Sequence, residues 1–190
     1  IIGYDHRFGR NRTANITDLI SFGNTFDFEV EEISAQEIDD VSVSSTKIRR
    51  ALEVGDIQTA NTYLGYKYML TGTVKKGKGL GRQLNFPTAN LHIAETYKLI
   101  PKNGAYVVQS NINGEIVFGM MNIGFNPTVA GTKKTIEVNF FDLNQDLYDR
   151  QLQIDIIDRL RDEHKFESVD ALKAQLLKDK ETSLSIIAKL

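Results

Sequence analysis

Hydrophobic and polar residues alternate in short runs along the middle of the chain, from residue 69 to residue 157. Apolar side chains at every second position are typical of β-strands, and Gly, Asn and Pro between the runs favour turns. Asn113-Gly114 lies between two such runs and predicts a tight hairpin, because both residues tolerate positive φ angles. Many short strands with close turns predict a small antiparallel barrel. The expected strands are Met69–Val74, Ala105–Ser110, Ile116–Asn122, Thr135–Phe141 and Leu152–Ile157.

Helical patterns precede the alternating segment. Ser44 or Ser45 is expected to cap a helix that ends at Gly55. Asp56 is expected to cap a second, shorter helix that ends near Gly65. We place a domain boundary near Gly65, so that residues 1–65 form one domain and residues 66–190 another.

The two ends of the chain add one strand and one helix. Partial alternation over Phe26–Ile33 predicts a strand, which gives the first third of the chain an α/β character. At the other end, Ser168 is expected to cap a helix whose apolar stripe consists of Val169, Leu172 and Leu176. The fold class is therefore mainly β: a barrel with a C-terminal helix, preceded by an α/β segment.

Composition narrows the possible functions. The 190 residues are 41% hydrophobic and 25% charged, with a formal net charge of −2, which is ordinary for a globular protein and unlike the basic surface of a nucleic-acid binder. The chain has no cysteine, which excludes disulfides and thiolate metal sites and favours the cytoplasm. Neither a membrane-spanning run nor a signal peptide is found. The chain begins at Ile1 rather than Met, so we expect a fragment of a longer protein.

A glycine-rich basic segment runs from Thr71 to Arg82. Glycines let backbone N–H groups approach an anion closely, and neighbouring cations add positive charge, a combination suited to a triphosphate. The segment lacks the Gly-Lys-Ser/Thr of a Walker loop. Composition alone favours a solvated hairpin loop instead. The residues concerned are Gly72, Gly77, Gly79, Gly81, Lys75, Lys76, Lys78 and Arg82.

The adjoining Pro87-Thr-Ala-Asn90 shifts the balance toward phosphate binding. The hydroxyl of Thr88 and the amide oxygen of Asn90 are hard ligands suited to Mg²⁺ that also contacts phosphate. On the expected strand Thr135–Phe141, Glu137 lies on the face opposite Ile136, and a carboxylate fixed on a strand is a good general base. Pattern alone favours a glutamate that only faces water.

A further candidate segment is Leu160–Phe166, between the last strand and the final helix. Arg161 and Lys165 could bind phosphate or the edge of a flavin, and Phe166 could pack on an aromatic ring. The alternative is an ordinary helix-entry loop in which Phe166 is a hydrophobic staple.

Taken together, these segments resemble the C-terminal part of the bacterial bifunctional riboflavin kinase/FMN adenylyltransferase family, also called FAD synthetase. The adenylyltransferase motifs are similar to Gly3–Gly9 and Ser44–Arg49, which are weak signals when taken alone. The kinase motifs are similar to Gly81–Asn90, Asn122–Thr128, Glu137, Asp146–Tyr148 and Leu160–Phe166.

The resemblance implies a six-stranded, Greek-key-like antiparallel barrel that makes FMN from riboflavin and ATP with Mg²⁺. It implies that Thr88 and Asn90 position the metal and phosphates, that Glu137 is the catalytic base and that the loop around Arg161 and Phe166 closes over flavin. It places ATP along Gly72–Arg82. It also makes the first 65 residues a Rossmann-like adenylyltransferase remnant, with Asp5, Phe8, Gly9, Ser45, Thr46 and Arg49 as its site residues.

The sequence departs from the family in three ways. Asn85 and Asp149 stand where the family usually has glycine, and Asp149 still tolerates a turn. The third departure is the lack of a His-x-Gly-His signature, since the histidines are His6, His92 and His164. We therefore expect this chain to make FMN but not FAD by itself, while the full-length parent makes both.

Two other functions remain open from sequence. One is a non-catalytic flavin- or nucleotide-binding regulatory barrel, which would not need Glu137. The other is an RNA-binding small barrel, which the net charge of −2 disfavours. The expected partners are the small molecules ATP, riboflavin and FMN, with no nucleic acid and no membrane, and the expected assembly state is a monomer.

Overall fold

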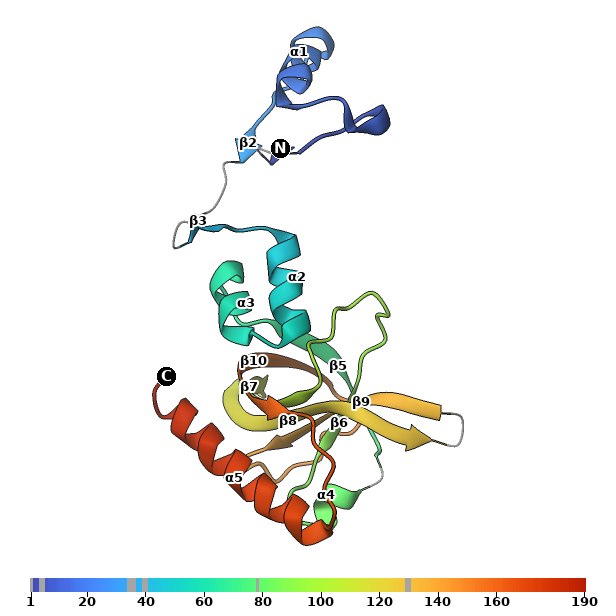
Figure 1. Ribbon diagram of the computed structural model, residues 1–190, viewed down its shortest axis with the longest axis vertical. Helices are drawn as coiled ribbons and strands as arrows, with labels where there is room; N and C mark the ends of the chain where they lie inside the picture. The colour runs from blue at the N-terminus through green and yellow to red at the C-terminus, as the bar shows by residue number, and fades with distance from the viewer. Residues whose placement is uncertain (1, 4–5, 34–36, 39–40, 78, 129–130) are drawn as a thin grey trace. The chain divides into compact units, whose positions relative to one another are not determined.

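The computed structural model describes residues 2–3, 6–33, 37–38, 41–77, 79–128 and 131–190 (Figure 1). The chain divides into two compact units, Ile1–Ser44 and Ser45–Leu190. In the part of the chain described, no helix is long and apolar enough to cross a membrane.

The first unit is built around helix α1 (Ile16–Phe26). Its other elements are short: β1 (Ile2–Gly3) pairs in parallel with β2 (Glu32–Ile33), β3 (Glu37–Ile38) pairs with β4 (Val41–Ser42), and a 3₁₀ turn covers Arg10–Arg12.

The strand expected over Phe26–Ile33 is wrong for most of that range, because only Glu32–Ile33 forms a strand and α1 ends at Phe26. The signal that was missed is a capping box. The side chain of Asn15 accepts the backbone N–H groups of Thr17 and Asp18, and the Asp18 carboxylate accepts the N–H of Asn15.

The second unit contains a closed barrel. Among the described residues its strands follow one another in the order β10-β5-β6-β9-β8-β7, and all of their pairings are antiparallel. Strand β6 lies beside β9 rather than β7, which is a Greek-key arrangement. The predicted barrel is thus confirmed. Its strands are β5 (Met69–Lys75), β6 (Ala89–His92), β7 (Gly104–Ile112), β8 (Glu115–Thr128), β9 (Gly131–Phe140) and β10 (Gln151–Asp162).

Apolar side chains at alternate positions of the strands fill the barrel. Ile136, Val138 and Phe140 of β9 are buried in the main core, as their spacing predicted, and Glu137 and Asn139 point to the other face. The hairpin expected at Asn113-Gly114 joins β7 to β8 with φ angles of 57° and 92°.

Helices α2 (Ser45–Val54) and α3 (Ile57–Leu64) pack on the barrel (Figure 1). Both confirm the expected helices: the Asp56 side chain accepts the Thr59 N–H at 3.1 Å, and Gly65 ends α3 in the left-handed conformation. Leu52 and Ile57 are buried in the barrel core. These helices therefore belong to the same compact unit as the barrel. The domain boundary that the sequence places near Gly65 stays a prediction.

Helix α5 (Val169–Ile187) lies along the barrel, against β7, β8 and β10 (Figure 1). Ser168 caps it as expected, with its hydroxyl accepting the Ala171 N–H at 3.1 Å. Leu172 and Leu176 pack on a second apolar cluster, which we call the α5 cluster and which consists of Leu84, Phe86, Met120 and Phe141. The third residue of the predicted stripe, Val169, is exposed instead, because it lies at the first turn of the helix.

The segment between β5 and β7 holds two elements that the sequence did not predict. Strand β6 is only four residues long. A helical turn of the same length, α4, covers Leu80–Gln83 within the glycine-rich segment. Four residues are too few for either periodicity to be recognised.

Candidate functional site

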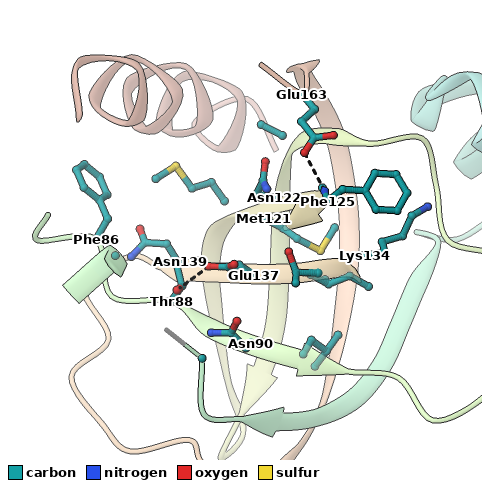
Figure 2. A pocket seen from close by; sticks show the side chains of 18 of the residues that line it. Phe86, Thr88, Asn90, Met121, Asn122, Phe125, Lys134, Glu137, Asn139 and Glu163 are labelled. Carbon is teal, nitrogen blue, oxygen red and sulfur yellow. Dashed lines mark hydrogen bonds between the residues drawn. The ribbon is translucent and has the colours of Figure 1, made fainter. Parts of the chain in front are cut away.

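A cavity of about 1160 Å³ opens between strands β6, β8 and β9, the glycine-rich segment and helix α5 (Figure 2). Its volume is somewhat above the usual range for small-molecule sites, about 300–1,000 Å³, so there is room for more than one ligand. One part of the lining is apolar and includes Leu84, Phe86 and Leu176, whereas another carries amide, hydroxyl and carboxylate groups.

The polar part is a row of side chains that runs across the neighbouring strands β5, β6, β9 and β8. Glu137 on β9 lies directly opposite Asn90 on β6 and opposite Asn122 on β8, and Asn90 lies opposite Lys75 on β5. Residues that are directly opposite in a sheet have side chains on the same face. Glu137 therefore lies between two amides on the cavity wall, as Figure 2 shows.

Thr88 is bound to the central carboxylate. Its hydroxyl donates to Oε2 of Glu137 at 3.2 Å, and both side chains are half-buried. A carboxylate held on a strand and oriented by a neighbouring hydroxyl has few rotamers open to it. Thr88, Asn90 and Glu137, which the sequence proposed separately, are thus brought together.

Asn139 holds the Pro-Thr-Ala-Asn segment against β9, a role that the sequence did not suggest. Its side-chain N–H donates to the Pro87 carbonyl at 2.8 Å, and the residue is buried. The β6–β9 ladder pairs Ala89 with Val138 and goes no further toward Pro87 in the described residues. The Asn139 amide therefore continues the ladder and fixes the residue before Thr88. The sequence offered one signal for a role of Asn139: on the expected strand it lies on the same face as Glu137.

The glycine-rich segment passes close over this row. A Cβ atom on Gly77 would lie 2.3 Å from Nδ2 of Asn90, and one on Gly81 would lie 2.3 Å from the Phe86 carbonyl oxygen. The Phe86 carbonyl belongs to the backbone, so Gly81 excludes any side chain, whereas a side chain at Gly77 would displace the Asn90 amide. Gly77, Gly79 and Gly81 all line the cavity, and the approach of their backbone to a bound phosphate stays a prediction.

The remaining candidates of this segment differ in position. Lys75 and Lys76 line the cavity, whereas Gly72 and Arg82 do not: Gly72 lies within β5 against the His92 carbonyl, and Arg82 is exposed on α4. Lys78 is outside the described residues.

The two departures from the family pattern share one backbone feature. Asn85 has a φ of 62° and Asp149 a φ of 59°, in the left-handed region that glycine prefers. Asn and Asp are the other residues that tolerate this region, so the turns are kept. Asp149 also forms an ion pair with Lys75 at 2.8 Å, and this lysine lowers the pKa of the Asp149 carboxyl below its usual range.

On the side of helix α5, Arg161 and Phe166 both line the cavity. The Arg161 guanidinium forms an ion pair with Asp179 of α5 at 2.7 Å. Glu163, a residue that the sequence did not single out, accepts the Asn103 side-chain N–H at 2.9 Å. It also accepts the Phe125 backbone N–H at 2.9 Å (Figure 2). These contacts join the end of β10 to α5, to β8 and to the segment before β7.

The candidates of the first third lie in different compact units. Phe8 and Gly9 are in the first unit, where Phe8 forms a bridge with Ala14 and Gly9 precedes the 3₁₀ turn. Ser45, Thr46 and Arg49 are exposed on α2 in the second unit. Asp5 is outside the described residues.

Within the described residues no group of three or more His, Cys, Asp and Glu side chains could hold a metal by itself. The cavity offers instead the oxygens of Thr88, Asn90 and Glu137 close together. Mg²⁺ commonly takes one or two protein ligands and completes its shell with water and substrate phosphates, so these residues fit such an ion.

A family model described as riboflavin kinase matches residues 64–187. The chain belongs to the riboflavin kinase family. A second model, FAD synthetase, matches residues 1–47. The resemblance inferred from the motifs is therefore confirmed.

Relatives match nearly the whole chain. The bifunctional riboflavin kinase/FMN adenylyltransferase of Listeria monocytogenes is 38% identical over 191 residues, which cover 100% of this chain and 60% of the relative. That of Haemophilus influenzae is 38% identical over 183 residues, 96% of this chain and 59% of the relative. A solved structure named as a macrolide-efflux protein from Streptococcus pneumoniae is 36% identical, with a TM-score of 0.83 over 96% of this chain and 59% of that one. The chain thus spans about three fifths of the length of these proteins.

Proposed function

We propose that the barrel transfers the γ-phosphate of ATP to the 5′-hydroxyl of riboflavin, which gives FMN and ADP. Membership of the riboflavin kinase family supports this reaction. The observation that carries it is the position of Glu137, which is bound to Thr88 and lies between two asparagines on the cavity wall.

The polar row is suited to phosphoryl transfer. This reaction has a loose transition state, so the protein mainly positions the reactants and neutralises charge. Glu137 accepts the proton of the attacking hydroxyl and orients its oxygen. Thr88 and Asn90 would hold Mg²⁺, which supplies positive charge against the phosphates. Gly77, Gly79 and Gly81 line this part of the cavity and place no side chain of their own between the row and the phosphates.

The apolar part of the cavity is suited to the flat flavin ring. Phe86, Met120, Leu172 and Leu176 line it, and they belong to the α5 cluster or pack on it. Apolar side chains of this kind stabilise a buried aromatic ring by removing its faces from water. A ring placed there extends its ribityl chain along the same cavity toward Glu137.

The match of residues 1–47 to FAD synthetase supports a second proposal. A protein that contains these residues together with the remaining length of the relatives also converts FMN to FAD. The 190-residue chain has no His-x-Gly-His sequence, and such histidines would stabilise charge on the phosphates as pyrophosphate leaves. We therefore assign FMN formation alone to this chain.

The test is to incubate the purified chain with Mg²⁺, ATP and either riboflavin or FMN, and to separate the flavins by chromatography. We expect FMN and ADP from riboflavin, and neither FAD nor pyrophosphate from FMN. Binding of riboflavin and ATP without FMN formation would support a non-catalytic binding barrel instead. FAD in proportion to the protein concentration would contradict the division of activities.

A further inference from the structure

We propose that Arg161 and Asp179 form a positioning pair that holds helix α5 over the apolar part of the cavity. Arg161 then acts on riboflavin binding through the helix and not by contact with a substrate. The inference rests on the proposed function, because it concerns the side of the cavity assigned to the flavin ring.

The guanidinium of Arg161 is directed at the helix. Its Nε donates to both carboxylate oxygens of Asp179 at 3.0 Å, and its Nη2 donates to Oδ2 at 2.7 Å. Its Nη1 donates to the Asp162 backbone carbonyl at 3.1 Å. Every nitrogen of the fork is thus engaged by the protein. An arginine that recognises a phosphate or a flavin edge presents its planar fork to the ligand instead.

The partner carboxylate lies in a site built for an ion pair. Asp179 is 4% exposed, and its Oδ1 accepts a further hydrogen bond from Nε2 of Gln175 at 2.7 Å. A buried carboxylate is costly unless it is paired and hydrogen-bonded. Removal of either member of the pair leaves a charge in a site that is closed to water on most sides, so the helix should shift to let water in.

Such a shift would change the cavity, because Asp179 lines it and shares a helix face with other lining residues. Leu176 precedes it by three positions and Leu172 by seven, and both line the cavity and pack on the α5 cluster. The ion pair therefore sets where these two leucines lie along the barrel.

The same guanidinium also positions an aromatic ring. The Cζ atom of Arg161 lies 5.7 Å from the centre of the Phe166 ring, and the His164 ring meets Phe166 edge-on at 5.2 Å. All three side chains line the cavity. One ion pair thus holds both the helix and the aromatic wall beside it.

The experiment compares Asp179→Asn, Arg161→Lys and the double variant, with Glu181→Gln as a control on the exposed face of the same helix. We expect Asp179→Asn to raise the Kd and KM for riboflavin about tenfold, and Arg161→Lys to raise them severalfold, while kcat at saturating riboflavin and KM for ATP stay within about twofold. The double variant should be no worse than the worse single variant, because both changes break one interaction. Riboflavin fluorescence gives the Kd, and circular dichroism identifies any variant that fails to fold.

Amide hydrogen exchange of residues 172–183 is the second measurement, and it does not depend on activity. Both single variants should exchange faster there than the parent chain and the control. Unchanged exchange, or parent-like riboflavin affinity in Asp179→Asn with a loss confined to Arg161→Lys, would overturn the proposal and assign Arg161 to direct contact with substrate. A parent chain that binds no riboflavin would overturn the flavin part of the proposal together with the proposed function. Exchange would still decide whether the pair holds the helix.

Discussion

The two sides of the cavity are held by different interactions. On the strand side, Glu137 and Asn139 belong to a paired strand, and their side chains form hydrogen bonds with Thr88 and the Pro87 carbonyl beside the neighbouring strand. Figure 2 shows the bond between Thr88 and Glu137. On the helix side, α5 is joined to Arg161 by an ion pair between the side chains of Arg161 and Asp179.

This difference separates two tasks. A strand ladder fixes neighbouring residues within the tolerance of its hydrogen bonds, which suits groups that act on the reacting atoms. A helix held by side chains can adjust as a substrate enters, which suits binding of a large ring. Substitutions on the strand side should therefore act mainly on turnover and on ATP binding, and those on the helix side mainly on riboflavin affinity.

The largest effect is expected from Glu137→Gln. The amide cannot accept the hydroxyl proton, so kcat should fall by roughly a hundredfold or more, as loss of a general base usually does. The Gln side-chain oxygen can still accept the Thr88 hydroxyl, so the thermal melting temperature and riboflavin affinity should stay near those of the parent chain. Steady-state kinetics measure the first and thermal unfolding the second.

The matched control is Glu115→Gln, which alters an exposed glutamate of β8 outside the cavity lining. It should leave kcat unchanged. Near-normal turnover in Glu137→Gln would remove Glu137 from the mechanism and end the assignment of chemistry to the strand side.

Asn139→Asp should give the next largest effect. The new carboxylate has nearly the same shape but cannot donate to the Pro87 carbonyl, so a buried bond is lost and two oxygens face each other. We expect a loss of about 1–3 kcal/mol in the free energy of unfolding and a lower kcat. Asn111→Asp is the control, because Asn111 uses its side-chain oxygen to accept the Gly114 N–H and an aspartate can do the same. Equal losses of unfolding free energy in both variants, measured by urea unfolding, would contradict the role of Asn139 in holding the Pro-Thr-Ala-Asn segment.

Thr88→Val should have a smaller effect that depends on magnesium. Valine keeps the shape and deletes the oxygen, so ATP affinity should fall about tenfold with Mg²⁺, the size typical of one lost charge-assisted contact, and change little without it. Calorimetric titration with and without Mg²⁺ measures both. Thr71→Val on β5, outside the cavity lining, is the control. Equal losses in the two conditions would indicate a packing role for Thr88.

Local patterns predicted much of this architecture. The alternation around Glu137, the Asn113-Gly114 turn and the caps at Asp56 and Ser168 each depend on residues within a few positions of one another, and each was found as expected. The Pro-Thr-Ala-Asn segment and Glu137 were recognised as one site only through the family resemblance, since forty-nine positions separate Thr88 from Glu137.

The parts that were missed depend on partners far away in the chain. Strand β6 is too short to show alternation, and it exists because β5 and β9 lie on either side of it. The ion pair of Arg161 could not be read from the sequence, because the α5 pattern marks its apolar stripe and gives no reason to select Asp179. The same holds for Asn139, whose partner carbonyl belongs to the segment before β6, fifty-two positions away.

The smallest expected effect is the response to acid of the ion pairs at the end of β10. Asp162, next to Arg161, accepts hydrogen bonds from Lys102 at 2.8 Å and Arg159 at 2.7 Å, which lower its pKa from 3.8 to about 2. Because this pKa is lower in the folded than in the unfolded chain, the carboxylate stabilises the fold above about pH 4, and that contribution is lost as the pH falls through about 2. The side chain is exposed, so the effect should be small and should weaken further in high salt. Urea unfolding of the parent chain and Asp162→Asn between pH 2 and pH 6 should show a stability difference that is constant above about pH 4 and narrows below it. A difference that persists unchanged to pH 2 would show that Asp162 contributes through its shape or neutral hydrogen bonds, and that charge does not hold this end of β10.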